Sequence, residues 1–317
     1  MKINNIIGLL GLSSFLLLNS SCSKDEEAIN VKEPEEITLS ESVLNLEINT
    51  NNSVEILSGG GDYKVFSTNE EVLTVEVEGN QIITNAIMPG NATVIVSDLN
   101  NKYSEIDVST YTLEIALENE DLELEILLGH PETIIVPIAI GNGGYEVSTE
   151  SEQIDVTVEK SIIYITGLKA GEGIFTITDS YGLEQDFSID ISTTLVAYTE
   201  KDLDEIMSDN ASCYFFNNKQ WDTAFYKYIN ETEGDMHHYG WNYYNSIYLH
   251  IYFQGDKNQG VKSNSSIYAK FDSRGEIFDE ELDLEIIKND GDKIWVVYSF
   301  IKDDKLNYGH FCQDIDP

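Results

Sequence analysis

Histidines gather near the end of the chain, where their spacing could hold a metal ion. Four of the five, His237, His238, His250 and His310, lie in the last third of the sequence. Neighbouring side chains on a strand point to opposite faces, so His237 and His238 could reach one ion only from a loop. Because Glu231-Thr232-Glu233-Gly234 precedes them, we expect a loop here. We interpret both as solvated loop histidines and predict no metal site.

A run of acids invites a two-carboxylate mechanism of the glycosidase kind. Asp279, Glu280 and Glu281 precede a segment in which Asp283 and Glu285 alternate with Leu282, Leu284 and Ile286. Alternation with apolar residues predicts that these acids occupy the solvent face of a strand. Carboxylates on one side of one strand also lack the opposed placement across a sugar that the mechanism needs.

An aromatic row is the strongest candidate for binding. Ile247, Leu249, Ile251 and Phe253 share one face of a predicted strand, and Tyr248, His250 and Tyr252 share the other, with Trp241 upstream. Such a row suits stacking on sugar rings. The alternative is that the helix or a second sheet covers this face and the tyrosines belong to the core.

The sequence lacks common catalytic motifs, and its negative net charge argues against nucleic acid as a ligand. The sequence holds no Gly-x-Ser-x-Gly, P-loop, His-Glu-x-x-His or Cys-x-x-Cys motif. We therefore predict a non-enzymatic protein without a cofactor. The net charge of −39 repels nucleic acid, which needs clustered Lys and Arg.

Two cysteines, Cys213 and Cys312, lie near the two ends of the final domain. In an oxidising compartment they could form a disulfide, but buried thiols are the equal alternative.

The elements that position these residues form a final domain over residues 195–317. This segment holds 23 of the 33 aromatic residues and all three tryptophans. Leu203, Ile206 and Met207 are spaced as on an amphipathic helix over residues 200–207, with Thr199 as its N-cap. Alternating runs after it predict strands over 213–216, 224–229, 243–253, 266–271, 276–278, 282–287, 293–301 and 308–312. We expect a mostly antiparallel sheet with one short helix.

Before this domain, an all-β pattern occurs twice. Gly61-Asp62-Tyr63-Lys64-Val65 matches Gly143-Gly144-Tyr145-Glu146-Val147 at a spacing of 82, and the spacing from Gly90 to Gly171 and from Asp98 to Asp179 is 81. A period of about 80 residues fits a whole sandwich domain. We predict two tandem domains, 37–110 and 111–194, with Asp98 and Asp179 capping equivalent turns rather than binding Ca²⁺.

The two copies resemble bacterial immunoglobulin-like domains of the Big-2 and related families. The Gly-Gly-x-Tyr-x-Val opening, the Ser-Thr-Asn-Glu step and the run Pro-Gly-Asn-Ala-Thr-Val-Ile-Val carry the resemblance. The Trp common in that family is absent from both copies, where Phe66 and Ser148 lie in the corresponding strand. The resemblance implies tandem β-sandwiches that act as spacers in surface proteins.

The N-terminus has the pattern of an export signal. An apolar run from Ile6 to Leu18, too short to span a bilayer, precedes Ser20-Ser21-Cys22. It resembles a bacterial lipoprotein signal over residues 1–21, although Asn19 replaces the usual Leu, and it implies lipidation of Cys22. The acidic stretch after Cys22 resembles the surface-export signal of Bacteroidota lipoproteins. Residues 22–36 are then a solvated tether.

Together these features predict an outer-membrane lipoprotein that faces the cell exterior. Its N-terminal lipid is expected to bind the membrane. The two spacers are expected to present a mainly β recognition domain to a glycan or a surface protein. The alternatives are an assembly subunit of an outer-membrane complex and a hydrolase with an unrecognised site.

Overall fold

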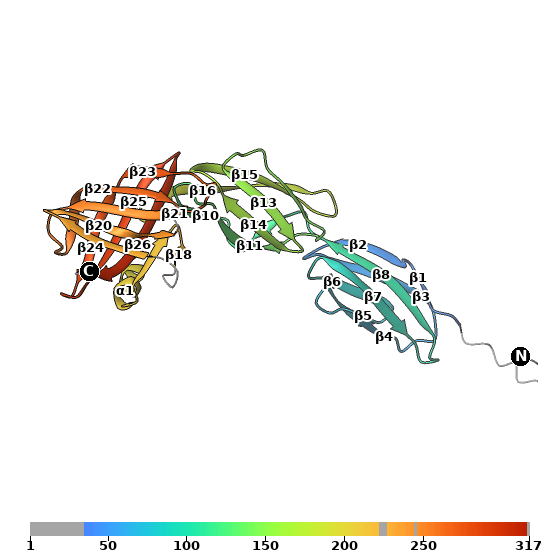
Figure 1. The fold of residues 1–317 in the computed structure, drawn as a ribbon. Helices are drawn as coiled ribbons and strands as arrows, with labels where there is room; N and C mark the ends of the chain where they lie inside the picture. The colour runs from blue at the N-terminus through green and yellow to red at the C-terminus, as the bar shows by residue number, and fades with distance from the viewer. Residues whose placement is uncertain (1–34, 222–226, 244–245, 316–317) are drawn as a thin grey trace, which may run out of the picture.

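Three β-rich units follow one another along the chain in a computed structural model that describes residues 35–221, 227–243 and 246–315. Figure 1 shows them strung in a row, with the N-terminal unit at one end and the helix-bearing unit at the other. Each has its own hydrophobic core, built from residues within 37–108, 115–191 and 213–312. The predicted signal, Cys22 and most of the tether lie outside the described residues. Among the described ones, no helix is long and apolar enough to cross a membrane.

The first unit is a sandwich of two four-stranded sheets. Its sheets have the orders β1-β3-β6-β5 and β2-β8-β7-β4, and β2 runs parallel to β8. Alternating side chains such as Val94 and Val96 turn inward and are fully buried. The strands are β1 (Thr38–Leu39), β2 (Val43–Glu47), β3 (Asn51–Ser58), β4 (Lys64–Ser67), β5 (Leu73–Glu78), β6 (Gln81–Ala86), β7 (Gly90–Ser97) and β8 (Tyr103–Tyr111).

The second unit repeats this topology strand for strand. Its sheets have the orders β9-β11-β14-β13 and β10-β16-β15-β12, and β10 again runs parallel to β16. The strands are β9 (Ala116–Leu117), β10 (Leu122–Leu127), β11 (Glu132–Ile140), β12 (Glu146–Ser148), β13 (Ile154–Glu159), β14 (Ile162–Gly167), β15 (Gly171–Thr178) and β16 (Glu184–Thr194).

The strand order makes both units immunoglobulin-like. When β2 and β10 are labelled A′ and the other strands are lettered in sequence, one sheet of each unit reads A-B-E-D and the other reads A′-G-F-C. This is the arrangement of the immunoglobulin sandwich. The predicted repeat is confirmed, because Tyr63 and Tyr145 immediately precede β4 and β12, and Gly90 and Gly171 begin β7 and β15.

Both capped turns are also present. The carboxylate of Asp98 accepts bonds from the backbone N–H groups of Gly60, Asn100 and Lys102 at 2.7–2.9 Å. In the second sandwich, Asp179 accepts them from Tyr181 and Leu183 at 2.9 and 3.0 Å. Both aspartates are nearly buried, so these bonds compensate for lost hydration.

The third unit is one rolled sheet with a short helix. Helix α1 (Glu200–Ser208) begins at Thr199, which forms a capping box with Asp202, as the sequence predicts. The sheet order is β18-β17-β26-β25-β24-β22-β21-β20-β19, with β23 also paired to β22. The strands are β17 (Cys213–Phe216), β18 (Lys219–Trp221), β19 (Lys227–Glu233), β20 (Met236–Tyr243), β21 (Ile247–Gln254), β22 (Gly260–Lys270), β23 (Phe278–Glu281), β24 (Asp283–Asn289), β25 (Lys293–Lys302) and β26 (Lys305–Asp314).

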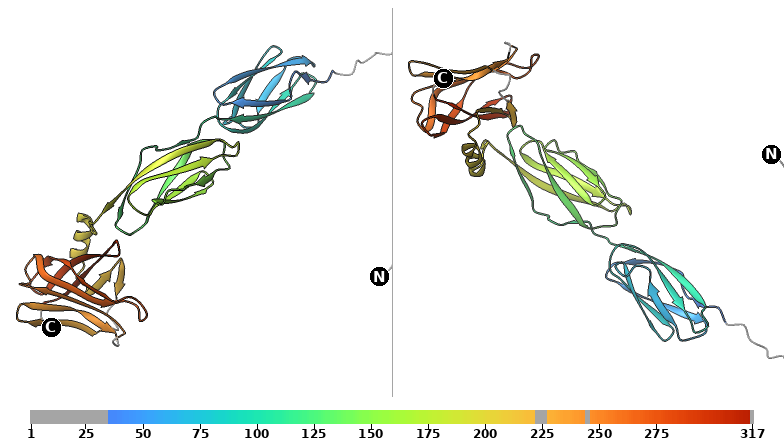
Figure 2. Two further views of the ribbon diagram at one scale, coloured as in Figure 1. Left: turned by 90° about the horizontal axis from the view of Figure 1, so that it is seen from above. Right: turned by 60° about the horizontal axis from the view of Figure 1, so that its bottom comes forward.

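The sheet folds over so that its two halves pack face to face. Trp221 of β18 stacks on Trp241 of β20 with ring centroids 5.3 Å apart, although these strands lie near opposite ends of the sheet order. The side-chain amide of Asn230 donates to the carbonyl of Asp314 at 2.6 Å, which ties β19 to the end of β26. Figure 2 shows the resulting two layers from two further directions. The inner faces therefore form the core, and each half keeps one outer face.

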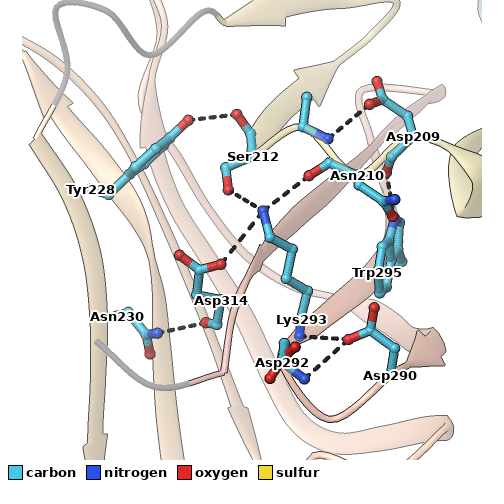
Figure 3. Close-up of polar contacts among 11 residues, drawn as sticks. Asp209, Asn210, Ser212, Tyr228, Asn230, Asp290, Asp292, Lys293, Trp295 and Asp314 are labelled. Atoms are coloured by element: carbon cyan, nitrogen blue, oxygen red, sulfur yellow. Dashed lines mark hydrogen bonds and ion pairs between the residues drawn. The ribbon is translucent and has the colours of Figure 1, made fainter.

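Helix α1 covers the outer face of the half built from β17 and β24–β26. Leu203, Ile206 and Met207 pack on a small cluster that contains Trp295. The segment after the helix is fixed by a polar network (Figure 3). In it, the indole N–H of Trp295 donates to the carbonyl of Asp209 at 2.7 Å, and the ammonium of Lys293 donates to the carbonyl of Asn210 at 3.0 Å.

Specific contacts also join the units. At the first junction, Asn142 exchanges hydrogen bonds of 2.8 and 2.9 Å with the backbone of Thr112. At the second, the N–H of Leu306 donates to the carbonyl of Leu128 at 2.9 Å, and the Nε2 atom of His130 lies 2.6 Å from the carbonyl oxygen of Leu306. These bonds restrain the orientation of each unit relative to the next.

Candidate binding face

The outer face of the other half of the sheet carries the predicted aromatic row. Tyr248, His250 and Tyr252 alternate along β21 with the buried Leu249, Ile251 and Phe253, and all three are partly exposed. The strand register extends the row sideways. Tyr252 lies opposite His238 of β20, and His250 lies opposite Tyr268 of β22.

This face is not part of the core. The alternative that the helix or a second sheet covers the tyrosines is therefore wrong. Helix α1 packs on the other half of the sheet, and in the part of the chain that the structure describes no element packs over the tyrosine row. Tyr268 is 41% exposed, and Tyr248 stacks beside it with ring centroids 5.1 Å apart. The row is therefore an accessible surface of adjoining rings.

Hydrogen bonds link the polar atoms of the row. His238 and His250 share a hydrogen bond of 2.9 Å between Nε2 of the first and Nδ1 of the second. The carboxylate of Glu231 lies 3.3 Å from Nδ1 of His238, and the ring of His238 stacks on Tyr252 at 4.4 Å. Stacking and hydrogen bonding together fix the ring planes in a preorganised surface.

The environment keeps the central groups uncharged at neutral pH. Burial, together with the neighbouring His238, lowers the pKa of His250 to about 4. A hydrogen bond with Tyr268, assisted by partial burial, raises the pKa of Tyr248 to about 12. Because the neutral forms prevail between these values, the row offers π-faces and uncharged hydrogen-bonding groups.

Trp241 does not belong to this face, so its assignment to the site is wrong. It lies opposite Leu249 in the β20–β21 register, and its side chain is fully buried against Trp221. The sequence placed it close to the row but did not reveal the strand parity. Because side chains alternate, Trp241 faces inward while His238, three residues earlier, faces outward.

The predicted loop at residues 235–238 is also wrong, because Met236 begins β20. His237 is buried and bonds to Thr232 at 3.0 Å and to the carbonyl of Gly255 at 2.8 Å. His238 points to the opposite face, so the two rings cannot share an ion. No group of three or more His, Cys, Asp or Glu side chains within the described ranges is arranged to hold a metal.

The acids at 279–285 lie as predicted. Asp279, Glu281, Asp283 and Glu285 are exposed along one side of β23 and β24, while Glu280 is half-buried and pairs with Lys302 at 3.1 Å. They form a solvated strand face, without two carboxylates opposed across a pocket.

Cys213 and Cys312 lie directly opposite each other on β17 and β26, and both are buried free thiols. The structure therefore shows the thiol alternative and not the disulfide. His310, two residues before Cys312, takes no part in the aromatic row, and its Nδ1 atom shares a hydrogen bond of 3.0 Å with the hydroxyl of Tyr198.

Sequence reasoning missed three members of the row, namely Glu231, His238 and Tyr268. Tyr268 lay in a predicted strand, so its period-two position was available as a signal. Glu231 and His238 were missed because the turn residues around Gly234 indicated a loop. The structure instead has a tight hairpin there, which joins β19 and β20.

Comparisons with known proteins return similarity to immunoglobulin-like tandems. No family model matches the chain. Over 148 residues, 46% of this chain, it is 24% identical to the mouse nuclear pore membrane glycoprotein 210-like, but it spans only 7% of that protein's length. Among solved structures, it is similar to titin Ig tandem domains A164-A165, with 10% identity, a TM-score of 0.35, and coverage of 51% of this chain and 99% of that one.

Domains 4 and 5 of the S-layer protein SbsC match with 20% identity and a TM-score of 0.20, over 51% of this chain and all of that one. A complex of Dpr11 IG1 with DIP-gamma IG+IG2 matches with 10% identity and a TM-score of 0.34, over 51% and 99%. The sandwiches are immunoglobulin-like. That assignment rests on their strand order.

Proposed function

We propose that this chain is a surface lipoprotein that uses its two immunoglobulin-like sandwiches as spacers and binds glycans on the outer face of β20–β22. The proposal rests on the uncovered row of Tyr248, His250, Tyr252 and Tyr268. This row belongs to the third unit, which lies at the opposite end of the molecule from the N-terminal unit (Figure 1).

The dimensions of the row suit a short oligosaccharide. Residues two apart on one strand face are separated by nearly 7 Å, so Tyr248 and Tyr252 span about 13 Å, the length of two or three sugar rings. Aromatic faces stack on the apolar faces of sugars, while the phenol and imidazole groups exchange hydrogen bonds with hydroxyls. The net charge of −39 favours neutral or cationic sugars over acidic polysaccharides.

The position of the row also supports a presenting role for the rest of the chain. Hydrogen bonds at both junctions, through Asn142 and through His130, restrain the three units as a series. Lipidation of Cys22 would attach the opposite end to a membrane, and two acyl chains give stable anchoring where one does not. A spacer of two sandwiches then holds the row away from the bilayer.

A glycan array probed with the full-length protein in detergent tests the binding. We expect neutral oligosaccharides to bind, and Tyr248→Ala and Tyr252→Ala each to weaken binding by about tenfold or more with near-native melting temperatures. Tyr103→Ala is the matched control, because this tyrosine is 69% exposed on the first sandwich. Unchanged binding by both row variants would refute the site.

Membrane fractionation tests the anchor separately. Replacing Cys22 with Ala should release the protein from membranes after a high-salt wash. Retention of that variant in the membrane fraction would contradict lipidation at Cys22, whatever the outcome of the glycan array.

A further inference from the structure

A groove lies beside helix α1, on the half of the sheet that does not carry the tyrosine row. Its volume is about 380 Å³. One wall comes from Val196, Tyr198 and Leu203, in the segment that leads into α1 and in the helix itself. The sheet supplies the rest, with Val261 of β22, Asp283 and Glu285 of β24, and Val297 of β25. The volume falls within the range of small ligand sites.

Both walls of the groove carry exposed apolar side chains. Val261 is 77% exposed, the largest value among the exposed large hydrophobic side chains in the described ranges, and Val196 on the other wall is 67% exposed. Leu203 and Val297 line the groove between them and are partly buried by the helix packing. Exposed apolar side chains on two facing walls mark a contact surface for a partner.

Two unpaired carboxylates stand at the same groove. Asp283 and Glu285 are exposed on one side of β24, and within the described residues neither side chain forms a hydrogen bond or an ion pair. The nearby Lys262 is already engaged, because its ammonium lies 2.8 Å from the carboxylate of Asp256. The negative charge of the groove is therefore available to a ligand.

The groove is preformed, because its helical wall is fixed to the sheet. The ammonium of Lys288 donates to the carbonyl of Met207 at 2.8 Å, at the C-terminal end of α1 where a cation is favoured. The indole of Trp295 holds the carbonyl of Asp209 (Figure 3). On the linker side, the Tyr198 hydroxyl shares a hydrogen bond with Nδ1 of His310. A ligand would not have to order these walls on binding.

The spacing of the acids indicates the form of the occupant. Because Asp283 and Glu285 are two residues apart on a strand, their Cα atoms are separated by nearly 7 Å. An extended polypeptide presents its own i and i+2 side chains at the same repeat. Lysine and arginine also combine an aliphatic stem, which Val196 and Val261 would cover, with a charged head for the carboxylates.

We propose that this groove binds an extended segment of a partner protein that carries Lys or Arg at positions i and i+2. The two basic heads pair with Asp283 and Glu285, and their stems lie against the valines of the two walls. This site is distinct from the glycan-binding row and would join the presented domain to a protein partner.

Fluorescence anisotropy with synthetic peptides and the full-length protein in detergent tests the proposal. The probe is a nine-residue capped peptide, Thr-Val-Ser-Lys-Val-Lys-Ser-Val-Thr. One comparison peptide places the two lysines side by side, which keeps the charge but sends them to opposite faces. We expect the probe to bind at least fivefold more tightly than that peptide. Equal binding of the two peptides, or no binding of the probe at millimolar concentration, would overturn the proposal.

Variants that each remove one negative charge test whether the peptide binds the groove or is attracted by the acidic chain as a whole. Asp283→Asn and Glu285→Gln should each weaken binding of the probe by at least fivefold, and Val261→Ser should weaken it by about threefold or more. Glu105→Gln and Asp107→Asn are the controls, because they form an exposed acidic pair two residues apart on β8. If the β8 variants lose as much affinity as the β24 variants, the binding is non-specific attraction to an acidic protein and the proposal fails.

Discussion

Asn142 occupies in the second sandwich the position that Gly60 occupies in the first. The backbone N–H of Gly60 donates to the buried carboxylate of Asp98 at 2.7 Å, whereas the side-chain amide of Asn142 donates to that of Asp179 at 2.5 Å. The same amide of Asn142 exchanges two bonds with the backbone of Thr112. An added Cβ at Gly60 would lie 2.1 Å from the side-chain amide of Asn100 and 2.7 Å from the carboxylate of Asp98, so both side chains would have to shift to admit this substitution in the first sandwich.

Asn142→Gly should therefore loosen the first junction. The variant loses the bonds to Thr112 and to Asp179, and we expect it to destabilise the second sandwich by about 2 kcal/mol. Small-angle scattering should show a broader distribution of end-to-end dimensions, and proteolysis should accelerate near residues 111–115. Asn101→Gly is the control, because this exposed residue already has a positive φ of 59°. Identical scattering curves for both variants would contradict a clamping role for Asn142.

Acidification should destabilise the third unit before its carboxylates protonate. Burial lowers the folded-state pKa of His250 and of His310 to about 4, below the unfolded value near 6.5. The folded state therefore favours the neutral imidazoles, and their contribution is complete above about pH 6.5 and is lost as the pH falls towards 4.

Denaturant titrations at pH 7.0 and 5.5 measure this effect. The free energy of unfolding should fall over this interval in the wild-type chain and fall less in His250→Gln. In the wild type, NMR titration should place the pKa of His250 well below 6. A pKa of 6.5 in the folded chain would contradict the burial and pairing described for this ring.

Lys293→Met should partly release helix α1 from the sheet. The ammonium donates to the carbonyl of Asn210 and to the hydroxyl of Ser212 at 3.0 and 2.9 Å, and the methionine leaves both acceptors unpaired. We expect a loss of about 2 kcal/mol and faster amide exchange over residues 200–212. Lys201→Met, on an exposed pair with Glu205, should cost less than about 0.5 kcal/mol. Equal losses from the two variants would show that Lys293 does not hold the segment.

Cys213 and Cys312 should react as buried thiols. Burial raises the pKa of both, that of Cys312 to about 12, so little thiolate forms at neutral pH. Disulfide-exchange reagents should label them more than about a hundredfold faster in denaturant than in the native chain. Mass spectrometry after alkylation without reductant should find both modified. Two unmodified residues linked by a disulfide would show that the protein oxidises across β17 and β26.

Local patterns were enough to predict much of this fold. The 81-residue register predicts two copies of one sandwich, and the structure gives both copies the same sheet orders. Thr199 and the spacing of Leu203, Ile206 and Met207 predict the helix, because a cap and an apolar stripe are properties of a few neighbouring residues. The alternation around Tyr248, His250 and Tyr252 likewise predicts which side chains share a face of β21.

Only the tertiary structure decided which strand faces are exposed and which distant segments pack against each other. Trp241 faces the core because it lies opposite Leu249 when β20 pairs with β21. The sequence did not predict β20, because the turn residues around Gly234 indicated a loop there. The contact between Trp221 and Trp241, and the placement of α1 on one outer face only, arise because the sheet rolls to bury its apolar inner surfaces. Such burial is a property of segments far apart in sequence, so alternation within a single strand specifies two faces but not which one the fold covers.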